Sequence, residues 1–114
     1  MAHIKNITFI HVDFKVDHRN RQPFGFLSGG ASLALAENIA GVGSLAICPG
    51  KISVGVSVSG THVKAVLEGD VVEATATLIH KGKTLHTWHV EIKNSEEELI
   101  SSVTVTNYII KPRE

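Results

Sequence analysis

The chain has 114 residues, 43% of them hydrophobic, which is enough for one domain, expected to span residues 1–114, and too little for two. Eleven Lys plus Arg balance eleven Asp plus Glu, so the formal net charge is zero. This balance argues against proteins that coat nucleic acid or bind membranes through basic charge, because both need an excess of Lys and Arg. We therefore expect no nucleic-acid partner and no membrane partner.

Cysteine usage and the apolar segments favour a soluble protein of a reducing compartment. Cys48 is the only cysteine, so no intramolecular disulfide can form, and we expect a cytoplasmic location. Residues 1–6 are mixed and polar, unlike a secretory signal. The longest apolar stretch, residues 31–47, carries Glu37 and Asn38 at its centre, and it is at the short end of the roughly 17–25 residues that span a bilayer. We interpret it as a buried helix.

The first predicted element is a strand at residues 10–16, where Ile, Val and Phe alternate with His, Asp and Lys. A helix follows from Gly29, because the segment is rich in Ala and Leu and poor in β-branched residues. Ser28 is a suitable N-cap, and Pro49-Gly50 ends the helix at the latest. Since the helix is apolar nearly all round, we expect it to be buried on most sides.

Four further strands are predicted after the helix, at residues 52–59, 71–79, 86–93 and 99–110. In the first of them, one face of the alternating pattern is apolar and consists of Ile52, Val54, Val56 and Val58. Short Gly-centred or polar turns connect the later strands, which favours antiparallel neighbours. A single antiparallel sheet of five to six strands around one long helix is the α+β hotdog architecture, although other two-layer α+β folds fit the same composition.

Glu37 is the most informative residue for function. It lies in the middle of the apolar helix, and no Lys or Arg occurs between Gln22 and Gly50. Burial of an unpaired carboxylate is costly and raises its pKa, so such a group is usually retained for use. The alternative is that Glu37 lies on a narrow exposed stripe with Asn38 and Ser44.

The start of the helix is a second candidate feature. Gly25, Gly29 and Gly30 surround Ser28, which leaves an open approach to unpaired backbone N–H groups that can stabilise an oxyanion. Gly29 and Glu37 are about 12 Å apart along a helix. The N–H donor and the carboxylate of one chain therefore cannot act on the same carbonyl, and an enzyme of this kind should be at least a dimer with shared sites.

Other chemistry has weaker support. His86 and His89 point to opposite sides of a strand, and nothing completes a convincing zinc set with them and His80, so no metal is expected. Cys48 has no basic neighbour or paired His and is interpreted as a packing residue. Spacing alone leaves a Ser-His-Asp triad open, but Ser28 lacks a nucleophile-elbow motif.

The stretch from Gln22 to Glu37, QPFGFLSGGASLALAE, resembles the hotdog acyl-CoA thioesterases of the phenylacetate-pathway and 4-hydroxybenzoyl-CoA (Arthrobacter-type) group. Within that group it is closest to the thioesterases acting on 1,4-dihydroxy-2-naphthoyl-CoA and to the proofreading enzyme of enterobactin synthesis. The likeness extends over most of the chain and includes residues 60–64, 80–82 and 86–88. The family pattern has His where this chain has Ser28, and its members carry a longer N-terminal segment, so an abbreviated N-terminus is expected.

The resemblance implies hydrolysis of an acyl-CoA thioester, with aromatic or small acyl groups and no cofactor beyond the coenzyme A of the substrate. Glu37 would attack the thioester carbon or activate water, while the Gly29 N–H of a neighbouring subunit polarises the carbonyl. Gln22 and Ser28 would form hydrogen bonds near the reacting group. The CoA arm would lie near His62, Lys64, Gly30, Lys83 and Thr84. The expected assembly is a homodimer, or a homotetramer built as a dimer of dimers.

Three alternatives remain at this stage. A dehydratase of the same fold would pair an acid with a His. This chain has Ser28 at the position of the His nearest the helix start, which counts against a dehydratase. A non-catalytic acyl-CoA-binding or assembly module would bind CoA esters without turnover. A purely structural β-rich dimer would tolerate Glu37→Gln or gain stability from it.

Overall fold

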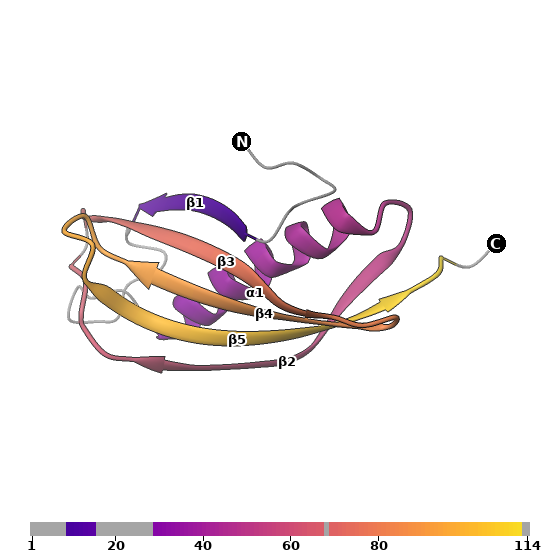
Figure 1. Cartoon of the computed structure of the whole chain (residues 1–114). Coiled ribbons are helices and arrows are strands. Elements are labelled where there is room, and N and C mark those ends of the chain that lie inside the picture. The colour runs from indigo at the N-terminus through magenta and orange to yellow at the C-terminus, as the bar shows by residue number, and fades with distance from the viewer. Residues whose placement is uncertain (1–8, 16–28, 68, 113–114) are drawn as a thin grey trace.

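The computed structural model describes residues 9–15, 29–67 and 69–112. The elements are β1 (Phe9–Lys15), α1 (Gly29–Ile47), β2 (Ile52–His62), β3 (Val71–Lys81), β4 (Leu85–Lys93) and β5 (Leu99–Ile110). All strand pairs are antiparallel, and the order across the five-stranded sheet is β1-β3-β4-β5-β2. Figure 1 shows α1 lying across one face of this sheet, with β1 and β2 at the two edges. The predicted hotdog architecture is confirmed.

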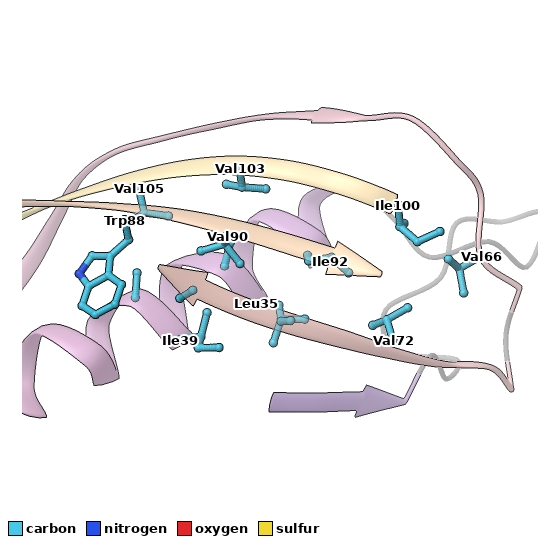
Figure 2. Close-up of a cluster of buried hydrophobic side chains, with 14 residues drawn as sticks. Leu35, Ile39, Val66, Val72, Trp88, Val90, Ile92, Ile100, Val103 and Val105 are labelled. Carbon is cyan, nitrogen blue, oxygen red and sulfur yellow. The ribbon is translucent and has the colours of Figure 1, made fainter. Parts of the chain in front are cut away.

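The core lies between α1 and the central strands, as the alternating patterns predict. On β4 the residues His86, Trp88, Val90 and Ile92 are all buried, while the residues between them are partly exposed. β3 and β5 alternate in the same way over most of their length. Figure 2 shows side chains of α1 and of the sheet converging in one cluster. The labelled members are Leu35, Ile39, Val66, Val72, Trp88, Val90, Ile92, Ile100, Val103 and Val105.

The prediction that α1 is buried on most sides is wrong. Ala34, Glu37, Asn38, Val42 and Leu45 are exposed and form one stripe at a spacing of three to four residues. The helix is long and apolar enough to cross a membrane by length and composition, with a mean hydropathy of 1.3 over residues 30–47. It packs instead against the sheet, so these properties are those of a core helix with one side left open.

β2 departs from its predicted alternation at Val56. Gly55 pairs with Asn107 and Ser57 pairs with Thr106, so Val56 is an extra residue in a β-bulge. Before the bulge, Gly55 lies on the helix-facing side and Val54, 43% exposed, lies on the outer face. The predicted single apolar face therefore does not exist, because an inserted residue exchanges the two faces of a strand.

A buried polar cluster anchors the C-terminal half of α1 to the sheet. Ser44 is fully buried, and its hydroxyl lies 2.8 Å from His86 Nδ1, 2.9 Å from Trp88 Nε1 and 3.2 Å from Asn107 Nδ2. Ser44 therefore does not belong to the exposed stripe that the sequence analysis gave as an alternative for Glu37 and Asn38. The prediction that Cys48 has no paired His is also wrong, because the Cys48 Sγ lies 3.7 Å from His86 Nε2.

Donor and acceptor capacity assigns the protons of this cluster. The Trp88 and Asn107 N–H groups donate to Ser44 Oγ and occupy its lone pairs, so the Ser44 hydroxyl donates to His86 Nδ1. His86 is then neutral and carries its proton on Nε2, facing Cys48. Consistently, burial lowers the pKa of His86 below 6.5, and the nearby positive charges of Lys81 and His80 lower it further.

The lowered pKa of His86 predicts a loss of stability in acid. The unfolded chain protonates His86 as the pH falls through about 6.5, whereas the folded chain does so only at lower pH. The free energy of unfolding should therefore fall below that pH. In His86→Gln, which keeps an acceptor for Ser44, this decline should be shallower. Urea unfolding of both proteins between pH 8 and pH 5 measures the difference, and parallel curves would show that His86 has no part in it.

Candidate active site

Glu37 lies in a groove between the open side of α1 and the first half of β2. The groove has a volume of about 330 Å³, and its walls combine polar groups of both elements with apolar helix side chains. Its lining residues are Glu37, Asn38, Gly41, Val42, Leu45, Ser53, Gly55 and Asn107. Glu37 is the one charged residue among these described lining residues, so the groove offers a carboxylate and no cation.

The carboxylate of Glu37 lies directly against the backbone of Gly55. A Cβ placed on Gly55 would collide with Glu37 Oε2 and lie 3.3 Å from the carboxyl carbon. The glycine therefore leaves the space that the carboxylate occupies. Gly60, further along the same strand, leaves space for the core in a similar way, since a Cβ there would lie 2.8 Å from Val103 Cγ2 and 3.2 Å from Leu33 Cδ2.

The interpretation of Glu37 as a buried carboxylate is wrong for the single chain, where the side chain is exposed. Glu37 stands at the border between the buried and open sides of α1, four residues after Leu33 and seven before Ser44, which both face the sheet. Helical spacing of this kind places the three on one ridge. Glu37 thus lies over β2, with its carboxylate against Gly55 and accessible from the groove.

Sequence reasoning missed Ser53 and Asn107 as groove residues. Ser53 Oγ is shielded from solvent and has no hydrogen-bond partner in the described parts of the chain. Asn107 is 1% exposed, pairs with Gly55 in the sheet and donates to Ser44, so it connects the groove to the buried cluster. The bulge at Val56 hid Ser53, because the apolar pattern assigned it to the outer face.

The predicted oxyanion donor, the Gly29 N–H, lies at the start of α1, away from Glu37. Gly29 is the first residue of α1, and a Cβ on the exposed Gly30 would meet no atom of the described residues within 4 Å. Gln22 and Ser28 lie outside the described residues. The helical bounds preserve the separation of about 12 Å between the Gly29 N–H and Glu37.

The other predicted binding residues fall into two groups at opposite ends of the sheet. His62 and Lys64 lie where β2 ends; His62 Nδ1 is 2.8 Å from Ser101 Oγ, and Lys64 forms an ion pair with Glu98. The hydrogen bond from Lys64, together with one from Asn94, lowers the pKa of Glu98.

Lys83 and Thr84 are exposed in the turn between β3 and β4, which lies near the beginning of β2. The Thr84 carbonyl accepts a hydrogen bond from the Ile109 N–H at 2.7 Å. A single chain therefore does not bring the two groups together. Over the described residues, no group of three or more His, Cys, Asp and Glu is arranged to hold a metal ion.

Comparison with known proteins identifies the family. Residues 24–101 match the model of the thioesterase superfamily. The chain is 35% identical over 103 residues to the 1,4-dihydroxy-2-naphthoyl-CoA hydrolase of Listeria monocytogenes. This alignment covers 90% of this chain and 83% of the relative. It is 35% identical over 96 residues to the enzyme of the same name from Escherichia coli, covering 83% and 70% respectively.

A solved structure agrees with the sequence relatives. The thioesterase HI1161 of Haemophilus influenzae superposes with a TM-score of 0.88 at 35% identity, covering 94% of this chain and 75% of that protein. The resemblance drawn from the sequence is thereby confirmed at the level of the superfamily. The chain belongs to the thioesterase superfamily and is a thioester hydrolase.

Proposed function

We propose that this protein hydrolyses acyl-CoA thioesters with small or aromatic acyl groups and that Glu37 is the reacting carboxylate. The observation that carries the proposal is the position of Glu37, held against Gly55 at the side of an open groove. A water molecule beside Glu37 can lose a proton to the carboxylate and attack the thioester carbon. Alternatively, the carboxylate attacks first and water hydrolyses the resulting anhydride. Both routes release the free acid and the CoA thiol.

The oxyanion donor of this mechanism is the Gly29 N–H of a second copy. Within one chain the Gly29 N–H lies about two helical turns from Glu37, which is too far for both groups to act on one carbonyl. Antiparallel pairing of two α1 helices removes that separation. The start of α1 then faces the thioester carbonyl, where the Gly29 N–H and the positive end of the helix dipole stabilise developing negative charge. Gln22 and Ser28 are proposed to add hydrogen bonds at the same place.

The surface beside the groove supports a homodimer. Among the described strands β2 is at an edge of the sheet and pairs with β5 alone, and its Val56 is 56% exposed. On α1, Val42 and Leu45 are 59% and 48% exposed. An unpaired strand edge next to an exposed apolar helix side is a surface that a second copy can cover.

A second apolar patch supports the dimer of dimers. Val54, Tyr108 and Leu85 are neighbours on the outer face of β2, β5 and β4, and each is between 42% and 44% exposed. This patch lies on the side of the sheet away from α1, so it remains free when the α1 sides of two copies meet.

Pairing of two chains also explains the divided CoA-binding residues. When two helices run antiparallel, the Gly30, His62 and Lys64 end of one copy approaches the Lys83 and Thr84 end of the other. We propose that the CoA arm lies there, with its phosphates near the two lysines. Lys64 would then exchange its ion pair with Glu98 for a phosphate, at low cost because both side chains are exposed.

The relatives support this substrate class. Two of them are named as hydrolases of an aromatic acyl-CoA, which favours the phenylacetate-pathway and 4-hydroxybenzoyl-CoA group within the superfamily. Solved variants of a Staphylococcus aureus neighbour replace a Gln and, fifteen positions later, a Glu by alanine, which is the spacing of Gln22 and Glu37. We propose that the enzyme works in the cytoplasm and without a cofactor.

Replacing Glu37 by Gln should lower kcat by about 10²- to 10⁴-fold, because the amide can neither accept a proton nor attack a thioester. Release of free thiol from benzoyl-CoA, followed with a thiol-trapping dye, measures the rate. Glu96→Gln is the matched control, since it removes an exposed carboxylate that lies outside the groove lining. If the Glu37→Gln protein hydrolysed at the wild-type rate, Glu37 would not be the reacting group.

Replacing Gly55 by Ala should displace the Glu37 carboxylate without unfolding the protein. The new Cβ meets the mobile end of a side chain, so the free energy of unfolding should change by less than about 1 kcal/mol, while kcat falls at least about tenfold. Thermal unfolding and the thiol assay measure the two effects.

Gly60→Ala, on the same strand, is the control for this prediction. A Cβ there meets Val103 Cγ2 and the Ser102 carbonyl, 3.1 Å away, so stability should fall more than with Gly55→Ala. Full activity in Gly55→Ala would show that the contact does not position the carboxylate.

A further inference from the structure

The end of the groove away from the helix start is formed by Ser53 and Leu45. Ser53 lies two residues before Gly55, so it is about 7 Å from the Glu37 contact along β2. Leu45 lies about 12 Å beyond Glu37 along α1. The groove therefore extends from the carboxylate in the direction opposite to the Gly29 end of the same helix.

The lining of this part of the groove suits an acyl group better than the CoA arm. The described lining residues contribute no Lys or Arg, and their one charge is the negative Glu37, which repels phosphates. Val42 and Leu45 provide apolar walls for a ring or a short chain. The groove volume of about 330 Å³ leaves room for an acyl group of that size.

Ser53 is the unusual group in this lining. Its Oγ is inaccessible to solvent and has no hydrogen-bond partner among the residues that the structure describes. A buried hydroxyl without a partner costs stability, so its presence on a groove wall points to a partner that binds there. No hydrogen bond to the described residues holds the Ser53 side chain in one rotamer, so its hydroxyl is free to turn toward a bound group.

We propose that Ser53 is a specificity-determining residue, whose hydroxyl forms a hydrogen bond with a polar substituent on the far end of the acyl group. The inference rests on the proposed function, because it places the thioester carbonyl at Glu37 and the acyl group between Val42, Leu45 and β2. An acyl group with a hydroxyl at its far end is then favoured over the same group without one. Ser53 forms no bond to the reacting atoms and selects the substrate.

The test compares 4-hydroxybenzoyl-CoA with benzoyl-CoA, which differ by one hydroxyl. For the wild type, kcat/KM should be higher with the hydroxylated ester. In Ser53→Ala this preference should fall about tenfold, because kcat/KM for 4-hydroxybenzoyl-CoA decreases. The kcat/KM for benzoyl-CoA should stay within about twofold of the wild-type value. Ser53→Thr, which keeps the hydroxyl, should retain the preference.

Two controls separate the outcomes. Ser57→Ala removes an exposed hydroxyl of the same strand, outside the groove lining, and should leave both rates unchanged. The melting temperature of Ser53→Ala should not decrease, because the variant loses an unpaired buried hydroxyl. An equal fall for both esters, or an unchanged preference, overturns the role of Ser53 while leaving Glu37 chemistry intact. If wild type hydrolysed neither ester, with or without hydroxyl, the proposed function itself would be overturned.

Discussion

The close approach of α1 to β2 determines how this site is built. Gly55 and Gly60 carry no side chains on the helix-facing side of β2. Glu37 Oε2 occupies the space that a Cβ on Gly55 would fill, while Val103 and Leu33 crowd the position of a Cβ on Gly60. Leu33 continues into the hydrophobic core, whereas Glu37, one turn later, ends in the groove. One ridge of the helix thus contributes both packing and chemistry. The position of the carboxylate depends on Gly55, which has no chemical function of its own.

The buried cluster around Ser44 complements this contact. Ser44 ties the next part of the ridge to β4 and β5 through His86, Trp88 and Asn107. Because hydrogen bonds are directional, they fix the rotation of α1 more sharply than apolar packing does. Asn107 belongs to this cluster and also lines the groove, so the polar interior and the site share one wall. β2 therefore lies directly beside the carboxylate, and the cluster around Ser44 fixes the rotation of the helix that carries it.

Much of the fold could be predicted from local pattern. The strands, the single helix and its end before Gly50 follow from period-two alternation, helix propensity and turn residues, and the structure has them at nearly the predicted bounds. The bulge at Val56 could not be predicted, because the sequence alternates without interruption from Ile52 to Val58 and only the pairing with β5 reveals the extra residue. That single residue decides that Ser53 and Gly55 face the helix.

Glu37 was recognised from its type and its apolar surroundings, but its burial was not predicted correctly. Composition shows which residues are apolar, and it does not show which side of a helix lacks a neighbour within the chain. The same reason explains why the sequence leaves open an exposed stripe that includes Ser44: its burial becomes evident only from its partners on β4 and β5. The side of α1 that faces the sheet is therefore determined by contacts between segments that are distant in the sequence, and the local pattern does not show these contacts.

The proposed mechanism requires that a carboxylate of one chain and a helix start of another act on one carbonyl. The most direct test is the sedimentation coefficient of the catalytically active species, measured while a band of enzyme sediments through benzoyl-CoA and a thiol-trapping dye. If two chains share each site, thiol release moves with a particle of at least twice the 12.3 kDa of one chain. Thiol release that moved with a 12.3 kDa monomer would contradict it.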